Sequence, residues 1–195
     1  DTHDTLCAKL SLGAGCLVVA VDYRLAPEYQ FPVAVDDCMA AYHWICQNTA
    51  ELGGDSFRIA IAGDSAGGNL AAVVSQQAMP SGMPLPIAQL LIYPALDFSF
   101  ETESFEAMPN AFVIPRERME WFRSHYLRNS ADISDPKASP LRAQDLSGQP
   151  ATMIVTGGFD PLRSEGKAYA DRLRDAGVSV QYREFEGQIH LLVCV

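Results

Sequence analysis

The sequence predicts an α/β fold, a mostly parallel β-sheet with helices on both faces. Short runs rich in valine, leucine and isoleucine alternate along the chain with longer runs whose apolar residues recur at helical spacing. Such alternation implies crossover connections, which make the strands parallel and pack the helices against the sheet. The 195 residues are enough for one domain with a substantial core. We therefore expect a single α/β domain over residues 1–195.

The first half of the chain is expected to contain two strands and two helices. They are a strand over 16–25 (CLVVAVDYRL), a helix over 33–49, a strand over 57–64 (FRIAIAGD) and a helix from Ala66 to about Ala78. The run over 16–25 is valine-rich and uninterrupted, as in a strand that is buried on both faces. The helix over 33–49 has Pro32 near its start and a glycine pair after its end, both of which are typical helix boundaries.

The second half of the chain is expected to contain three more strands and a helix. The strands cover 88–96 (AQLLIYPAL), 151–160 (ATMIVTGGFD) and 178–186 (VSVQYREFE). The helix lies between the last two strands, with Leu162, Tyr169 and Leu173 on one face. Gly177 is expected to end it, because glycine is the usual residue after a helix.

Residues 97–150 interrupt this alternation, because they are far longer than a crossover requires. They contain a predicted helix around 115–129 and eight large apolar residues: Phe98, Phe100, Phe105, Met108, Phe112, Met119, Trp121 and Phe122. A long insertion of this kind is usually functional, and its apolar content predicts a cap over a pocket. The alternative is that the aromatic side chains only anchor the insertion to the core, and both interpretations can hold together.

The composition is that of a globular protein without the features that bind nucleic acid or membranes. Hydrophobic residues make up 48% and charged residues 19%, and no apolar run approaches the ~20 residues of a membrane helix. The 14 basic and 24 acidic residues give a net charge of −10, which would repel a phosphate backbone. The N-terminal stretch DTHDTLCAKL lacks a signal-peptide pattern, which predicts a cytoplasmic location. Assembly into a homo-oligomer is left open.

The cysteines and histidines predict neither disulfides nor a metal site. The five cysteines, an odd number without C-x-x-C spacing, are at positions 7, 16, 38, 46 and 194. Cys38 and Cys46 share the predicted helix over 33–49, where about 12 Å of helical rise separates them, too far for a disulfide. We expect reduced cysteines that serve as small apolar residues. The four histidines show no zinc spacing, so no metal and no cofactor is expected.

The stretch IAGDSAGGNLA (61–71) places Ser65 in a turn between a predicted strand and a predicted helix. This G-x-S-x-G pattern is short enough to occur by accident, and a glycine-rich turn that merely holds a hydroxyl is the alternative. In a strained turn of this kind the neighbours must be small, so that the backbones approach and the hydroxyl projects. Gly63, Ala66, Gly67 and Gly68 meet that requirement.

Two further residues lie where a nucleophilic serine would need them. Asp160 ends a predicted strand in GGFDPLRSE, and His190 follows the last strand in EGQIHLL. Taken alone, Asp160 would be a helix N-cap before proline, and a lone loop histidine is more often inert. Together, the three residues follow strand ends in the order Ser, Asp, His. We interpret Ser65 as nucleophile, His190 as general base and then acid, and Asp160 as the residue that orients the histidine.

Several motifs together resemble a known family. They are DYRLAPEYQFP (22–32), GDSAGGNLA (63–71), IYPALD (92–97) and the run DPLRSEGKAYADRLRDAGVSVQYREFEGQIH (160–190). They are similar to the hormone-sensitive-lipase-like branch of the α/β-hydrolases, the bacterial family IV esterases. The resemblance implies an α/β-hydrolase fold and a serine carboxylesterase that hydrolyses short- to medium-chain acyl esters through an acyl-enzyme. It assigns the same roles to Ser65, Asp160 and His190.

The sequence departs from this family at both ends. The family's oxyanion hole combines the backbone N–H after the nucleophile, here Ala66, with donors from a His-Gly-Gly-Gly loop, which is absent here. The strand before that loop would lie between the strands that hold Val19 and Ile61, so we expect a gap in the sheet. The family also continues after His190 into a helix. These departures predict an internal piece of a longer esterase, which folds poorly or hydrolyses esters feebly by itself.

Two alternative functions stay open on the sequence. An amidase or deacylase would use the same three residues with a different pocket. A ligand-binding receptor is the second alternative, because the plant gibberellin receptors share the fold and resemble this family without the histidine. The presence of His190 argues against a pure receptor. The expected partner is therefore a small-molecule ester, and no feature beyond the fold supports a structural or interaction module.

Overall fold

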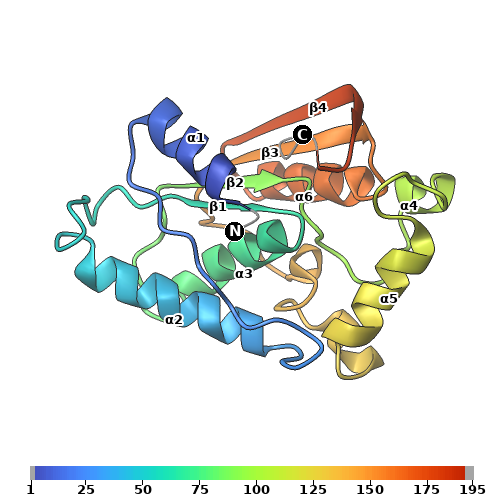
Figure 1. The fold of residues 1–195 in the computed structure, drawn as a ribbon, viewed down its shortest axis with the longest axis horizontal. Helices are drawn as coiled ribbons and strands as arrows, with labels where there is room; N and C mark the ends of the chain where they lie inside the picture. The colour runs from blue at the N-terminus through green and yellow to red at the C-terminus, as the bar shows by residue number, and fades with distance from the viewer. Residues whose placement is uncertain (1–2, 192–195) are drawn as a thin grey trace.

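The computed structural model describes residues 3–191, which form a parallel sheet with helices packed against it (Figure 1). The helices are α1 (Asp4–Ala14), α2 (Val33–Asn48), α3 (Ala66–Ala78), α4 (Glu103–Ala107), α5 (Arg116–Tyr126) and α6 (Arg163–Asp175). The strands are β1 (Ile61–Asp64), β2 (Ala88–Ile92), β3 (Ala151–Phe159) and β4 (Val180–Ile189). Two short 3₁₀ helices, η1 (Ser130–Ser134) and η2 (Pro140–Arg142), follow α5. The predicted α/β fold is confirmed.

The four strands lie in the order β1-β2-β3-β4, and every neighbouring pair is parallel. Asp64 is in register with Ile92, Ile92 with Val155, and Val155 with Arg183. This row of residues runs across the sheet near the carboxyl ends of β1 and β2. The chain segments that follow β1 and β2 leave the sheet at its carboxyl edge, where α/β proteins place their reactive groups.

The main core lies between the sheet and the two helices α3 and α6. Leu91 of β2 and Ile154 of β3 are fully buried against Ala72 of α3 and Tyr169 and Leu173 of α6. Helix α2 packs on the outer side of α3, and Figure 1 shows α1 on the opposite side of the strands from α2 and α3. No residue of α1 is buried. The side chains that pack on α3 and α6 therefore contribute most to the stability of the sheet.

The predicted helices over 33–49 and 66–78 are confirmed as α2 and α3, and the helix that Gly177 ends is α6. Gly177 has φ +81°, a backbone conformation in which glycine is not strained. The helix expected around 115–129 is α5, which is shorter at both ends. The strands expected over 57–64 and 88–96 shorten to β1 and β2, because the ladder between them pairs only Ile61–Asp64 with Gln89–Ile92 and the ladder with β3 ends at Ile92.

The predicted strand over 16–25 is wrong, because these residues form no strand in the described structure. Leu17, Val19 and Val21 have exposed side chains instead of the buried faces that the apolar run predicts. A strand requires a neighbour that pairs with its backbone, and β1, the edge strand of the described sheet, is paired only with β2. The described sheet therefore has four strands and not the expected five.

The insertion over 97–150 packs several of its aromatic side chains into the core. Phe100 and Phe105 are buried, with ring centroids 4.8 Å apart, and they lie in a cluster with Ala95 and Leu162. In contrast, the side chain of Phe112 is 86% exposed. The contacts expected from an anchored insertion are thus present, and the cap function stays a prediction.

The remaining sequence expectations concern membranes and cysteines. Across residues 3–191 no helix is both long and apolar enough to cross a membrane. Cys7, Cys16, Cys38 and Cys46 are free thiols, and the fifth cysteine, Cys194, lies outside the described residues. Burial raises the pKa of the Cys38 thiol to about 11, so this cysteine is protonated and unreactive at neutral pH.

Candidate active site

Ser65 occupies a strained turn between β1 and α3. Its φ of +52° and ψ of −116° lie in a region that residues with side chains rarely adopt. The turn brings backbones so close that a Cβ at Gly63 would lie 2.1 Å from the carbonyl oxygen of Gly67. A Cβ at Gly68 would lie 2.8 Å from Cβ of Pro94. Gly63 and Gly68 are therefore required by this turn, whereas a Cβ at Gly67 would make only an ordinary contact, 3.9 Å from Oδ1 of Asp64.

Hydrogen bonds from the end of β2 hold the backbone of Ser65 in this conformation. The Ser65 N–H donates to the carbonyl oxygen of Ile92 at 2.9 Å, and the Ala95 N–H donates to the carbonyl oxygen of Ser65 at 3.2 Å. The buried amide of Asn69 donates to the carbonyl oxygens of Ala95 and Ala138 at 2.8 and 2.7 Å. The sequence analysis assigned no role to Asn69, although a polar residue in a helix of small apolar residues was a usable signal.

The structure brings Ser65, Asp160 and His190 into one hydrogen-bonded chain. Nε2 of His190 lies 3.0 Å from Oγ of Ser65, and Nδ1 of His190 lies 2.8 Å from Oδ2 of Asp160. The His190 side chain is 2% exposed and the Asp160 side chain is fully buried. With Nδ1 protonated toward the carboxylate, Nε2 carries the lone pair that faces the serine hydroxyl. This arrangement can deprotonate Ser65.

Asp160 combines the two roles that the sequence left as alternatives. Its Oδ1 accepts a 2.9 Å hydrogen bond from the N–H of Leu162, immediately before α6, while Oδ2 faces His190. The carbonyl oxygen of Asp160 also accepts from the N–H of Arg163 at 3.1 Å. The helix start therefore fixes the carboxylate, and the carboxylate in turn fixes the imidazole.

Glycines in β3 allow the end of β4 to bring His190 over the sheet edge. Gly157 pairs with Phe185 and Phe159 pairs with Ile189, so the one residue of β3 between these pairs opposes three residues of β4 and the ladder is irregular there. A Cβ at Gly157 would lie 2.7 Å from the carbonyl oxygen of Gln188. The sequence pattern did not link these glycines to the position of His190.

Tyr93 is a second residue of the site that the sequence analysis missed. Its ring is fully buried, and its centroid lies 4.5 Å from that of His190. Its φ of +37° is rare for an aromatic residue, and its N–H donates to the carbonyl oxygen of Val155 at 2.6 Å. Tyr93 thus supports the face of the imidazole. Its hydroxyl makes a long contact of 3.4 Å with Oδ2 of Asp64.

Asp64 and Ala66 flank Ser65. The Asp64 carboxylate lies 3.2 Å from Nε2 of His3, the residue that precedes α1. The phenol of Tyr23 lies nearby, and its pKa is raised mainly by burial, with additional contributions from the negative charges of Cys38 and Asp64. Ala66 is the first residue of α3, and the N–H groups of a first helical turn have no acceptor within the helix. Its N–H is thus available to a negatively charged oxygen next to Ser65.

Among the described residues, no group of three or more histidine, cysteine, aspartate or glutamate side chains is placed to bind a metal. The hydrogen-bonded chain of Ser65, His190 and Asp160 has the groups that a nucleophile, a base and an orienting carboxylate would require.

Known alpha/beta hydrolases and ester hydrolases are similar to nearly the whole of this chain. The family profile described as alpha/beta hydrolase fold matches residues 1–193. The carboxylic ester hydrolase LipN of Mycobacterium tuberculosis is 44% identical over 196 residues, covering 97% of this chain and 52% of LipN. An ethyl acetate hydrolase of Pseudomonas putida is 38% identical over 191 residues, covering 97% and 60%.

A solved structure of a thermostable esterase from Pseudomonas putida ECU1011 superposes with a TM-score of 0.96 at 39% identity, covering 99% of this chain and 61% of that one. This chain thus spans about half to three fifths of the length of these relatives.

Proposed function

This chain belongs to the alpha/beta hydrolase family, and from that premise we propose that the protein containing it hydrolyses carboxylic esters with Ser65 as nucleophile. The relatives named as ester hydrolases support the reaction class, and the resemblance to the hormone-sensitive-lipase-like branch is confirmed. The observation that carries the proposal is the hydrogen-bonded chain from Asp160 through His190 to Ser65.

The reaction would proceed in two steps. Oγ of Ser65 attacks the ester carbonyl carbon while Nε2 of His190 takes its proton, and the alkoxide leaving group then receives that proton as the C–O bond breaks. Water, deprotonated by His190, attacks the resulting acyl-serine and releases the carboxylic acid and free Ser65. Asp160 stabilises the imidazolium that forms in each step.

The Ala66 N–H is proposed as one donor to the oxyanion of each tetrahedral intermediate. Removal of a single such donor can lower turnover by about 10²–10³-fold. Because this chain spans only part of its relatives, we propose that the remaining donors belong to a segment outside these 195 residues. We also propose that the insertion over 97–150 caps the acyl or alcohol site. A cytoplasmic location and homo-oligomer formation stay predictions.

The proposal is tested with p-nitrophenyl esters of two to twelve acyl carbons, the corresponding acetanilide, and a fluorophosphonate probe. We expect hydrolysis of short- and medium-chain esters, little amide cleavage, and one phosphonate adduct on Ser65 by peptide mapping. Ser65→Ala should abolish both hydrolysis and labelling at nearly unchanged stability. Turnover that persists in Ser65→Ala would disprove the assignment of the nucleophile, and preferential anilide cleavage would favour the amidase alternative.

A further inference from the structure

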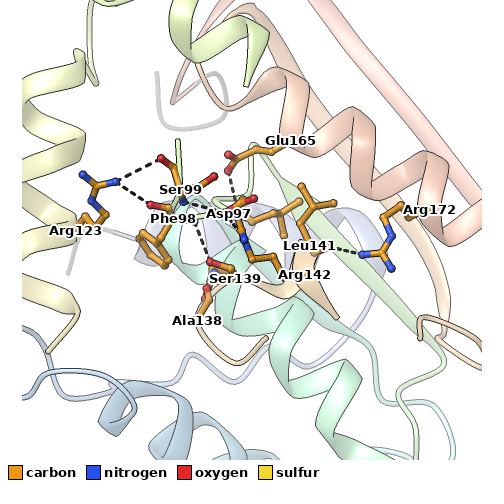
Figure 2. Close-up of polar contacts among 12 residues, drawn as sticks. Asp97, Phe98, Ser99, Arg123, Ala138, Ser139, Leu141, Arg142, Glu165 and Arg172 are labelled. Carbon is orange, nitrogen blue, oxygen red and sulfur yellow. Dashed lines mark hydrogen bonds and ion pairs between the residues drawn. The ribbon is translucent and has the colours of Figure 1, made fainter. Parts of the chain in front are cut away.

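Glu165 is a fully buried carboxyl that the proposed reaction does not use. It lies in the first turn of α6, five residues after Asp160, and is 1% exposed. Its Oε1 accepts a 2.6 Å hydrogen bond from the N–H of Leu96, and Figure 2 shows its side chain directed from α6 toward the segment that follows β2. A buried carboxyl is costly unless it is hydrogen-bonded. This contact is therefore the main reason that the site tolerates a glutamate.

Residues 95–99, which receive this contact, also hold the serine turn. The Ala95 N–H donates to the carbonyl oxygen of Ser65, and the Asn69 amide donates to the carbonyl oxygen of Ala95. Leu96 is fully buried, so its backbone N–H cannot turn to water if an acceptor is lost. Glu165 therefore stabilises the same segment that keeps Ser65 in its strained conformation.

The other side of this segment is held by the insertion (Figure 2). Several hydrogen bonds make this connection, among them Leu141 N–H to Leu96 O at 3.0 Å, Arg142 Nε to Asp97 Oδ1 at 2.9 Å, Phe98 N–H to Ser139 Oγ at 3.0 Å and Arg123 Nη1 to Phe98 O at 3.0 Å. The segment is also connected to α6. Among the hydrogen bonds of the described residues, the contact of Glu165 with Leu96 is the one that joins a side chain of α6 to this segment. Loss of this contact would leave the Leu96 N–H without its acceptor and would remove the direct bond between the segment and α6, while Ser104 of the insertion stays bonded to Pro161 and Ser164.

We propose that Glu165 is a positioning residue that fixes the Ser65 turn relative to the Asp160 loop through the backbone of Leu96. The inference rests on the proposed ester hydrolysis and deepens it. Ser65 and Asp160 come from different strands, and the reaction requires both to meet His190 within hydrogen-bond distance. A displacement of about 1 Å at the reacting atoms can cost about 10²-fold in rate. Glu165 touches no reacting atom and acts only through this geometry.

Burial favours the uncharged form of the Glu165 carboxyl. Burial raises its pKa well above the ordinary value, more than the Leu96 N–H lowers it, and the negative charges of Asp97 and Asp160 add to the rise. Arg142 does not reverse this effect, because it is paired with Asp97. Glutamine has nearly the same shape, is also uncharged, and retains an oxygen that accepts from Leu96. Glu165→Gln should therefore preserve the hydrogen bond with Leu96, whereas Glu165→Ala should remove it.

The test uses the protein expressed from its complete gene, with Glu165→Gln, Glu165→Ala and Leu173→Ala as variants. Leu173 is a fully buried residue of the same helix that belongs to the same apolar cluster as Leu96 but makes no side-chain hydrogen bond to residues 95–99, so its truncation controls for a general loss of stability. For each variant, kcat and KM for p-nitrophenyl acetate and the rate of fluorophosphonate labelling of Ser65 are measured per folded molecule. Thermal unfolding by circular dichroism gives the folded fraction.

We expect Glu165→Ala to lower kcat and the labelling rate by about 10-fold or more, with KM nearly unchanged. Glu165→Gln should stay within about threefold of the wild type, and Leu173→Ala should unfold at a lower temperature but retain its kcat. If Glu165→Ala does not fold, Glu165→Asp takes its place, because the shorter side chain withdraws the carboxyl from Leu96.

Wild-type kcat in Glu165→Ala or Glu165→Asp would overturn the inference. A loss in Glu165→Gln as large as in Glu165→Ala would also overturn it. A wild-type protein that hydrolyses no ester would refute the proposed function itself, an outcome that is distinguishable because it appears before any substitution at Glu165.

Discussion

Asp160→Asn separates the two roles of Asp160, because asparagine can keep one hydrogen bond and must change the other. Its oxygen can still accept from the Leu162 N–H, where Oδ1 of the aspartate now lies 2.9 Å from the nitrogen. Its NH₂ group then faces Nδ1 of His190, which must become an acceptor. The proton moves to Nε2, and the nitrogen that faces Ser65 loses the lone pair that the base requires.

The expected effect on turnover is large and the expected effect on stability is small. A wrong histidine tautomer costs about 10⁴-fold in kcat in serine proteases, or about 5 kcal/mol of transition-state stabilisation. Because the hydrogen bond to Leu162 is retained, the free energy of unfolding should change little. Asp160→Ala also removes the bond to Leu162, which should destabilise the protein by an additional ~0.5–2 kcal/mol.

The assay is the kcat for p-nitrophenyl acetate, together with the thermal midpoint of each variant. Asp175→Asn is the matched control, since it makes the same charge change at an exposed position near the end of α6. The control should have wild-type kcat. Near-normal turnover in Asp160→Asn would refute the reasoning, and Asp160 would then be only a helix cap.

Three further predictions concern packing and charge. Gly68→Ala should destabilise the protein by about 1–3 kcal/mol, because its Cβ would lie 2.8 Å from the proline after Tyr93. Urea unfolding measures this loss, and an unchanged unfolding midpoint would contradict the close approach of the proline to Gly68. The pKa of Glu165 is raised, so its contribution to stability is complete below the ordinary value of 4.5 and is lost as pH rises through the folded-state pKa. The melting temperature of Glu165→Gln should therefore increase relative to that of the wild type as pH rises. Parallel curves of melting temperature against pH for the two proteins would argue against a raised pKa of Glu165. The bond from Arg24 lowers the pKa of Asp37 to about 2. In Arg24→Gln this pKa should rise toward the ordinary value of 3.8, which an NMR titration of Asp37 measures.

The helices and the three residues that meet at the sheet edge were readable from the sequence because each is marked by a local pattern. The catalytic roles of these residues stay a proposal. Apolar spacing identified α2 and α3, and the small residues around Ser65 indicated the tight turn. Asp160 and His190 were found because parallel strands end at one edge of a sheet, so that residues following strand ends come together.

The strand predicted over 16–25 failed because an apolar run shows only a preference for strand. The strand itself depends on a partner, and β1 does not pair with this segment. Arg24 illustrates the same limit on a smaller scale. The structure pairs it with Asp37 of α2 at 2.6 Å, a partner that the sequence next to Arg24 does not indicate.

The sequence by itself therefore determined which chemical groups are available and the order in which the chain presents them at strand ends. Only the tertiary structure decided that Ser65 and His190, 125 residues apart, meet at 3.0 Å. It also decided that the two oxygens of Asp160 serve different partners and that Glu165 is buried. The physical reason is that burial and hydrogen-bond partners depend on the register and packing of distant segments, whereas propensity and periodicity depend on neighbours along the chain.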